Sequence, residues 1–308
     1  MKPGEEEKME SIRMTANGLE FEILVSGRSD QLMLLLHGFP DDARSFLPMM
    51  RILNDAGYMC AAPYMRGYWP TSVPESVSES QFATIQIADL AADAAAITLQ
   101  LKVRYDLKAV YLVGHDWGAI AAYGAVNHSS GLYEKAVMMS VPPGPAFLRN
   151  LLTNPSQLAR SWYILFFQVP ALPEHIIRSG RGEFIAKLWR DWSGDMSPFR
   201  ERMAEVIDTL SRPHSLRAAL AYYRGLLRPP PGELAKWNLS RRLFLAPVRA
   251  PALVLSGETD HCISSAMFNN CEKEIGQAGG RYRMIKNAGH FLPLEAPEKV
   301  VAEILQFI

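Results

Sequence analysis

The segment Gly114–Gly118 (GHDWG) constrains the fold of this chain more than any other part of its sequence. It directly follows the apolar run Lys108–Val113 and precedes the alanine-rich stretch Ala119–Asn127. This order predicts a buried strand, a sharp turn and a helix. A glycine on either side leaves room for a strained turn that lifts the central side chain, Asp116, clear of the sheet. The pattern is typical of a nucleophile elbow.

An aspartate at the centre of such a turn favours a particular chemistry. A serine needs a base before it can attack, whereas the Asp116 carboxylate is already an anion at neutral pH. Asp116 is therefore expected to attack an electrophilic sp³ carbon and to form an alkyl ester. Taken alone, the spacing also fits an aspartate that caps the following helix, so partners for Asp116 are needed to decide between the two.

Composition limits the classes of partner. Among 308 residues, Lys+Arg and Asp+Glu each number 32, so the balanced charge argues against a nucleic-acid partner. No stretch approaches the ~20 apolar residues of a membrane helix, so stable membrane insertion is not expected. The acidic N-terminus lacks the apolar core of a secretory signal. Three cysteines without a CxxC pair suit a reducing compartment. Together these features predict a cytoplasmic globular protein.

Alternating strands and helices predict an α/β fold, with a mostly parallel central sheet covered by helices on both faces. The predicted strands are Leu19–Val25 (an antiparallel edge), Gln31–Leu36, Tyr58–Ala62, Lys108–Val113, Lys135–Ser140, Ala252–Leu255 and Arg281–Ile285. The predicted helices in the same regions are Ala43–Asn54, Gln81–Arg104, Ala119–Asn127 and Pro297–Ile308.

The alternation of strands and helices stops after Val141, and no strand is predicted from there to about Pro230. Aromatic-rich helical stretches fill this region instead. Because open parallel sheets bind ligands at the carboxyl ends of their strands, the insertion is expected to cover that edge as a helical cap or lid. The sequence thus divides into a first core part (1–141), a cap (142–235) and a second core part (236–308).

Two residues late in the chain complete a candidate triad with Asp116. Asp260 ends the turn after the strand Ala252–Leu255, and His290 follows the strand Arg281–Ile285. His290 is expected to act as the base, and Asp260 to orient the imidazole and stabilise its charged form. Glu258 is an alternative acid that sits earlier in the same turn.

The segment His37–Pro40 (HGFP) follows the strand Gln31–Leu36 directly and can bring a backbone N–H toward the elbow. The N–H groups of Phe39 and Trp117 are the expected oxyanion hole. A cis peptide before Pro40 would fix this turn. His115, beside the nucleophile, is expected to pack or to make a supporting hydrogen bond.

These motifs together resemble the α/β-hydrolase fold in its epoxide hydrolase branch, over nearly the whole chain. The matching segments are His37–Pro40, Arg66–Tyr68, Gly114–Gly118, Gly257–Asp260 and Gly289–His290. The resemblance implies two cap tyrosines that hold the epoxide oxygen. It places the first at Tyr163 and favours Tyr223 over Tyr222 for the second. It implies hydrolysis of a small apolar epoxide to a vicinal diol with water, through an ester on Asp116 and with no cofactor or metal.

Two other functions remain open from the sequence. A haloalkane dehalogenase shares the aspartate elbow and could bind halide with the Trp117 indole. That family also requires a second hydrogen-bond donor at the position of Phe39, and a phenyl ring cannot donate a hydrogen bond. A non-catalytic, ligand-binding member of the fold is the other alternative. It is disfavoured because binding alone does not require Asp116, Asp260 and His290 together. Homodimer formation is also left open.

Overall fold

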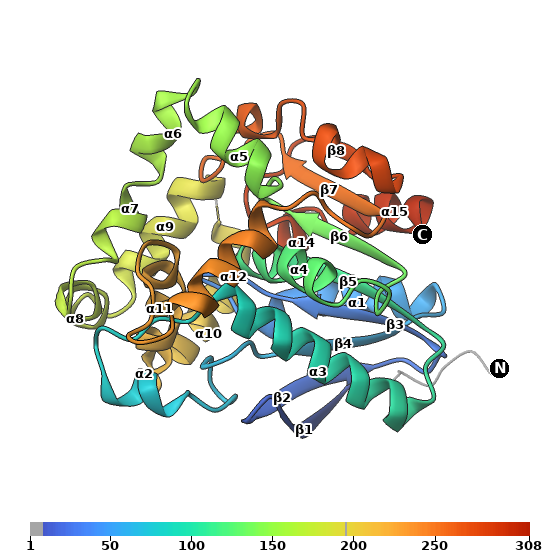
Figure 1. The fold of residues 1–308 in the computed structure, drawn as a ribbon, viewed down its shortest axis with the longest axis horizontal. Helices are drawn as coiled ribbons and strands as arrows, with labels where there is room; N and C mark the ends of the chain where they lie inside the picture. Colours follow the sequence, from blue (N-terminus) through green and yellow to red (C-terminus); the bar gives the residue numbers. More distant parts are fainter. Residues whose placement is uncertain (1–8, 195) are drawn as a thin grey trace.

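The computed structural model describes residues 9–194 and 196–308. Eight strands form one sheet in the order β1-β2-β4-β3-β5-β6-β7-β8 (Figure 1). Strands β3 to β8 run parallel to one another, while β2 pairs antiparallel with both β1 and β4. The strands are β1 (Glu10–Ala16), β2 (Leu19–Ser26), β3 (Gln31–Leu36), β4 (Met59–Pro63), β5 (Ala109–His115), β6 (Lys135–Met139), β7 (Ala252–Gly257) and β8 (Arg281–Ile285).

The structure confirms every predicted strand to within two residues at each end, but corrects the edge of the sheet. Leu19–Val25 is not an edge strand, because β1 lies outside it. β1 alternates exposed residues with the buried Ile12, Met14 and Ala16, so only one of its faces is apolar. Half of β1 is polar, and its period of two therefore gives a weaker signal than the fully apolar central strands.

Helices cover both faces of the sheet, as predicted. Helices α3, α4 and α12 pack together on one face, and α1 and α15 pack together on the other (Figure 1). Their bounds are α1 (Leu47–Asp55), α3 (Ile87–Tyr105), α4 (Trp117–His128), α12 (Leu234–Leu245) and α15 (Pro297–Phe307). Shorter elements of the core are η1 (Ala43–Phe46), α2 (Glu75–Glu79), η3 (Ser265–Phe268), α13 (Glu272–Ile275), η4 (Gly276–Ala278) and α14 (Leu292–Glu295).

Two predicted helices differ from the structure, one in its start and one in its continuity. The helix expected from Gln81 begins at Ile87, where the Asp89 side chain accepts the backbone N–H of Gln86 over 3.0 Å. The helix expected over Ala43–Asn54 is split into the 3₁₀ turn η1 and the helix α1. Asp42 caps η1 by accepting the N–H of Arg44.

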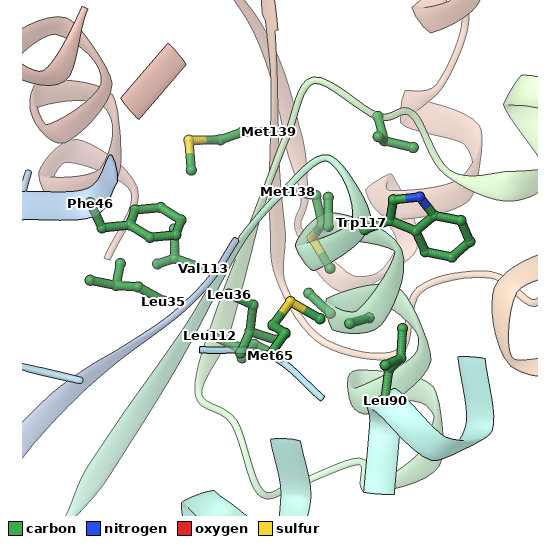
Figure 2. Packing of buried hydrophobic residues seen from close by; sticks show 14 of the residues in the cluster. Leu35, Leu36, Phe46, Met65, Leu90, Leu112, Val113, Trp117, Met138 and Met139 are labelled. Carbon is green, nitrogen blue, oxygen red and sulfur yellow. The ribbon is translucent and has the colours of Figure 1, made fainter. Parts of the chain in front are cut away.

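Apolar side chains on both faces of the central strands form the core. Neighbouring residues of one strand, such as Leu35 and Leu36, point to opposite faces (Figure 2). Leu35 and Val113 lie on the side of Phe46, whereas Leu36 lies on the side of Leu90. The strands are apolar on both faces because helices bury both faces.

The insertion between β6 and β7 is helical, and its described residues contain no strand. Its helices gather beside the carboxyl ends of the parallel strands, at the left of Figure 1. They are α5 (Gly144–Leu151), α6 (Pro155–Arg160), α7 (Trp162–Phe166), α8 (Leu172–Ser179), α9 (Glu183–Ser193), η2 (Ser197–Phe199), α10 (Arg200–Ser211) and α11 (Ser215–Leu227), followed by α12. Within the described ranges, no helix is long and apolar enough to cross a membrane.

Candidate active site

Asp116 occupies a strained turn between β5 and α4. Its backbone has φ 51° and ψ −117°, a conformation that is rare for residues other than glycine. The two flanking glycines are required by close backbone contacts. A Cβ on Gly118 would overlap the carbonyl oxygen of Leu36, and one on Gly114 would overlap that of Gly118. The turn therefore needs both glycines in order to lift Asp116 away from the sheet.

The two carboxylate oxygens of Asp116 have different neighbours. Oδ1 accepts a hydrogen bond of 2.7 Å from the backbone N–H of Phe39. Oδ2 lies 3.6 Å from Nε2 of His290. Asp116 is buried. The carboxylate is thus held by one oxygen, while the other faces the imidazole.

His290 and Asp260 lie together as the sequence predicts. Nδ1 of His290 donates to Oδ2 of Asp260 over 2.9 Å. The other oxygen of Asp260 accepts the backbone N–H groups of Cys262 (2.7 Å) and Ile263 (2.9 Å). Glu258, the alternative acid, is exposed and accepts instead from the N–H of Asn287. Geometry therefore favours Asp260 as the partner of His290.

The electrostatics of the site favour a charged imidazole. Burial alone would lower the pKa of His290, but the carboxylates of Asp260 and Asp116 raise it to about 10. His290 is thus an imidazolium at neutral pH while both carboxylates are charged.

The loop after β3 supplies one of the two expected oxyanion donors. The Phe39–Pro40 peptide is cis, as predicted, and the Phe39 N–H reaches Asp116 as described above. Trp117 is the first residue of α4, so its N–H has no partner within the helix. The structure thus shows the Phe39 N–H at the Asp116 carboxylate, while Trp117 follows Asp116 directly in the chain.

The three tyrosines of the insertion have different hydroxyl partners. The hydroxyl of Tyr222 donates to the carbonyl oxygen of Arg66 over 2.9 Å. The Tyr163 hydroxyl lies 3.3 Å from Sγ of Cys262. The Tyr223 hydroxyl is buried and donates to no described residue, and its oxygen faces the indole N–H of Trp117. The O–H of Tyr223 is therefore available to donate a hydrogen bond to a substrate.

Tyr163 and Tyr223 face each other near the elbow. Their ring centroids are 5.7 Å apart, and the ring of Tyr223 also lies 5.1 Å from that of Trp117. Burial raises the pKa of both phenols well above the ordinary value. Both hydroxyls consequently stay protonated and can donate hydrogen bonds.

Several residues that hold His290 were missed by sequence reasoning. Oγ of Ser193 accepts the backbone N–H of His290 over 2.8 Å, and the ring of Trp192 lies 5.0 Å from the imidazole. Nε2 of His115 and Oγ of Ser140 contact the carbonyl oxygen of His290 at 2.8 and 2.7 Å. For His115 this is the supporting hydrogen bond that the sequence predicts.

Glu295 was also missed. Its carboxylate accepts the backbone N–H groups of Gly289 (2.7 Å) and Phe291 (2.8 Å), on either side of His290. It also accepts the hydroxyl of Ser193 over 2.6 Å. The only signal in the sequence was its position five residues after His290. Its partner Ser193 lies in the insertion and could not be paired with it.

The positions of the histidines and acids do not form a metal site. Within residues 9–194 and 196–308, no group of three or more His, Cys, Asp or Glu side chains could hold a metal ion. His128, His175, His214 and His261 are exposed.

Comparison with known proteins identifies the family of this chain. Residues 33–304 match the alpha/beta hydrolase family. The chain belongs to this family. The fold expected from the motifs is thereby confirmed.

The similar proteins include named epoxide hydrolases, which confirms the resemblance to that branch. Epoxide hydrolase 3 of Xenopus tropicalis is 29% identical over 96% of this chain and 77% of its own length. Epoxide hydrolase A of Mycobacterium tuberculosis is 26% identical over 95% of both chains. The crystal structure of epoxide hydrolase VrEH1 from Vigna radiata superposes with a TM-score of 0.77, at 25% identity over 99% of both chains.

Proposed function

We propose that this protein hydrolyses an epoxide to a vicinal diol through a covalent ester on Asp116. The observation that carries the proposal is the pair of protonated, buried phenols of Tyr163 and Tyr223 beside a carboxylate that already faces His290. Opening an epoxide by attack produces an alkoxide, and a phenol can donate a proton to that oxygen as it forms. The names of the similar proteins point to the same reaction.

In the first step, Oδ2 of Asp116 attacks one epoxide carbon and the carbon–oxygen bond on that carbon breaks. Tyr163 and Tyr223 donate hydrogen bonds to the departing oxygen, which stays attached to the second carbon and takes a proton from one of the phenols. The His290 imidazolium returns a proton to that phenol through water and is left neutral. The product is a hydroxyalkyl ester of Asp116. Because esterification removes the charge of Asp116, one of the two carboxylates that raise the pKa of His290 is lost.

In the second step, His290 takes a proton from water as that water attacks the ester carbonyl carbon. The N–H groups of Phe39 and Trp117 stabilise the negative charge on the carbonyl oxygen. Asp260 stabilises the imidazolium that forms. The bond between the carboxyl carbon and the alkyl oxygen then breaks, the proton passes from His290 to that oxygen, and the diol leaves. The proton of the Asp116 carboxyl group formed in this way passes to His290, which restores the starting charges.

The helical insertion, residues 142–235, acts in this proposal as the cap that supplies both tyrosines and covers the substrate. Aromatic rings around Tyr223, those of Phe39 and Phe167 among them, favour a small apolar epoxide. Cytoplasmic location and homodimer formation stay predictions of the sequence.

A dehalogenase reaction is less well supported. The Phe39 side chain packs edge-on against Phe167 and Tyr223 and offers no hydrogen bond to a halide. Both reactions share the ester on Asp116, so they are separated by product. We expect diol from styrene oxide and no halide release from chloro- or bromoalkanes.

A covalent intermediate can be tested by mass spectrometry of the His290→Gln variant after exposure to styrene oxide. We expect the peptide that contains Asp116 to gain the mass of one styrene oxide, because ester hydrolysis loses its base, worth ~10²–10⁴-fold. The Asp116→Asn variant is the matched control and should gain no mass. Slow turnover without an adduct, or an adduct on another residue, would overturn the mechanism.

A further inference from the structure

A buried ionic cluster joins the cap to the loop that carries Phe39. Asp42 lies three residues after Phe39 and its side chain is fully buried. Arg202 on the cap helix α10 donates to Oδ1 of Asp42. Thr209, two turns further along α10, donates to Oδ2 of Asp42 over 2.8 Å. One carboxylate of the core thus accepts hydrogen bonds from two residues of the same cap helix.

Further contacts tie the cap to this loop. Nε of Arg202 donates to Oγ of Ser45 over 2.9 Å, and its Nη2 lies 3.5 Å from Oδ1 of Asp41. On the other side of the cluster, Nε1 of Trp189 on α9 donates to the carbonyl oxygen of Pro40 over 2.8 Å. The cap therefore holds the chain on the Pro40 to Ser45 side of Phe39 by several hydrogen bonds.

The charge of Asp42 makes this connection strong. Burial raises the pKa of Asp42, but Arg202 and Arg44 together lower it to about 2. The carboxylate is therefore ionised and depends on these two guanidinium groups. A buried charge that loses one of its partners is destabilised. Arg44, the partner that would remain, lies on the same loop as Asp42, so without Arg202 the cap would hold this loop less firmly.

We propose that Arg202 and Thr209 are positioning residues for the oxyanion hole, because they hold through Asp42 the loop whose Phe39 N–H donates to Asp116. This inference rests on the proposed ester mechanism. Neither residue touches the reacting atoms. The cap would then have a second role besides carrying Tyr163 and Tyr223: it sets the position of a donor that belongs to the core.

The two chemical steps respond differently to this donor. During attack on the epoxide the Asp116 carboxylate loses negative charge, so a hydrogen bond from Phe39 does not favour that step. During ester hydrolysis negative charge develops on the carbonyl oxygen, and the same hydrogen bond then stabilises the transition state. Loosening the loop should therefore slow hydrolysis of the ester and leave its formation unchanged.

The test is a single-turnover experiment with styrene oxide, in which ester on Asp116 and diol are followed by rapid quenching and mass spectrometry. Loss of an oxyanion donor costs ~10²–10³-fold, so its partial displacement in Arg202→Met should slow ester hydrolysis about tenfold. Thr209→Val removes a neutral hydrogen bond and should slow it by a smaller factor. Arg202→Lys, which keeps the charge, should recover part of the loss.

Lys187→Met is the matched control, because Lys187 makes an exposed cap ion pair with Asp191; it should behave as the unmodified protein. Equal slowing of both steps, or unchanged ester hydrolysis in folded Arg202→Met, would overturn the inference. If Arg202→Met does not fold, the rates of ester formation and ester hydrolysis in Thr209→Val test the inference by the same criteria. Absence of any ester in the unmodified protein would instead refute the proposed function.

Discussion

The Tyr163 hydroxyl rests 3.3 Å from Sγ of Cys262, a residue whose backbone N–H also donates to Asp260. A single residue therefore contacts both a cap tyrosine and the acid that orients His290. Burial raises the pKa of the Cys262 thiol well above its ordinary value, so it remains neutral. A neutral thiol is a weak hydrogen-bond partner, which leaves the Tyr163 hydroxyl free to turn to a substrate oxygen.

The Cys262→Ser variant should slow ester formation. A serine hydroxyl competes for the Tyr163 hydroxyl more strongly than a thiol, and a hydrogen bond of ~1 kcal/mol corresponds to about a fivefold loss. Ester hydrolysis should be unchanged, because the backbone N–H to Asp260 is retained. Single-turnover rates measure both steps, with Cys271→Ser as the control for a buried cysteine elsewhere. Slower hydrolysis with unchanged ester formation would contradict this account.

Phenylalanine substitutions should distinguish the adjacent tyrosines. Tyr223→Phe removes an uncommitted donor and should lower kcat/KM for styrene oxide by roughly 10–100-fold, since Tyr163 remains. Tyr222→Phe leaves the buried carbonyl of Arg66 without its partner and should cost about 1–2 kcal/mol of unfolding free energy. Steady-state kinetics and urea unfolding of both variants test this. The assignment fails if Tyr222→Phe loses the activity and Tyr223→Phe keeps it.

Protonation of His290 should make stability depend on pH. Its folded pKa of about 10 lies above the ordinary 6.5, so the folded protein binds this proton more tightly than the unfolded chain does. The resulting stabilisation is complete below pH 6.5 and is lost as pH rises toward 10. Urea unfolding of the unmodified protein and of His290→Gln should show a difference in unfolding free energy that declines over this interval. A constant or growing difference would show that the imidazole is not held in its charged form.

Gly38→Ala should disable the nucleophile. A Cβ on Gly38 would overlap Cβ and Oδ1 of Asp116, so either the carboxylate or the Phe39 N–H has to move. Displacement by about 1 Å can cost ~10²-fold in rate, and we expect a loss of that size in ester formation or hydrolysis. Gly276→Ala is the control, because its Cβ would meet no atom within 4 Å. Full activity of Gly38→Ala would contradict this prediction, because it would show that the site tolerates the displacement of Asp116 or Phe39.

Residues next to strand ends were the predictable part of the site. Asp116, Asp260 and His290 each follow a strand of the parallel sheet, and the carboxyl ends of such strands share one edge. Apolar runs marked the strands before Asp116 and Asp260, and two glycines marked the elbow. Local pattern was enough because strand direction alone brings these positions together.

The surroundings of the site depend on contacts between segments that are distant in sequence. The choice between Tyr222 and Tyr223 was favoured by a family pattern, but the physical reason is the carbonyl of Arg66, which engages the Tyr222 hydroxyl. Contacts of Arg202 with Asp42, and of Ser193 with His290, span 160 and 97 positions. No periodicity encodes such pairs, because they arise only when the cap helices pack on the loops of the core.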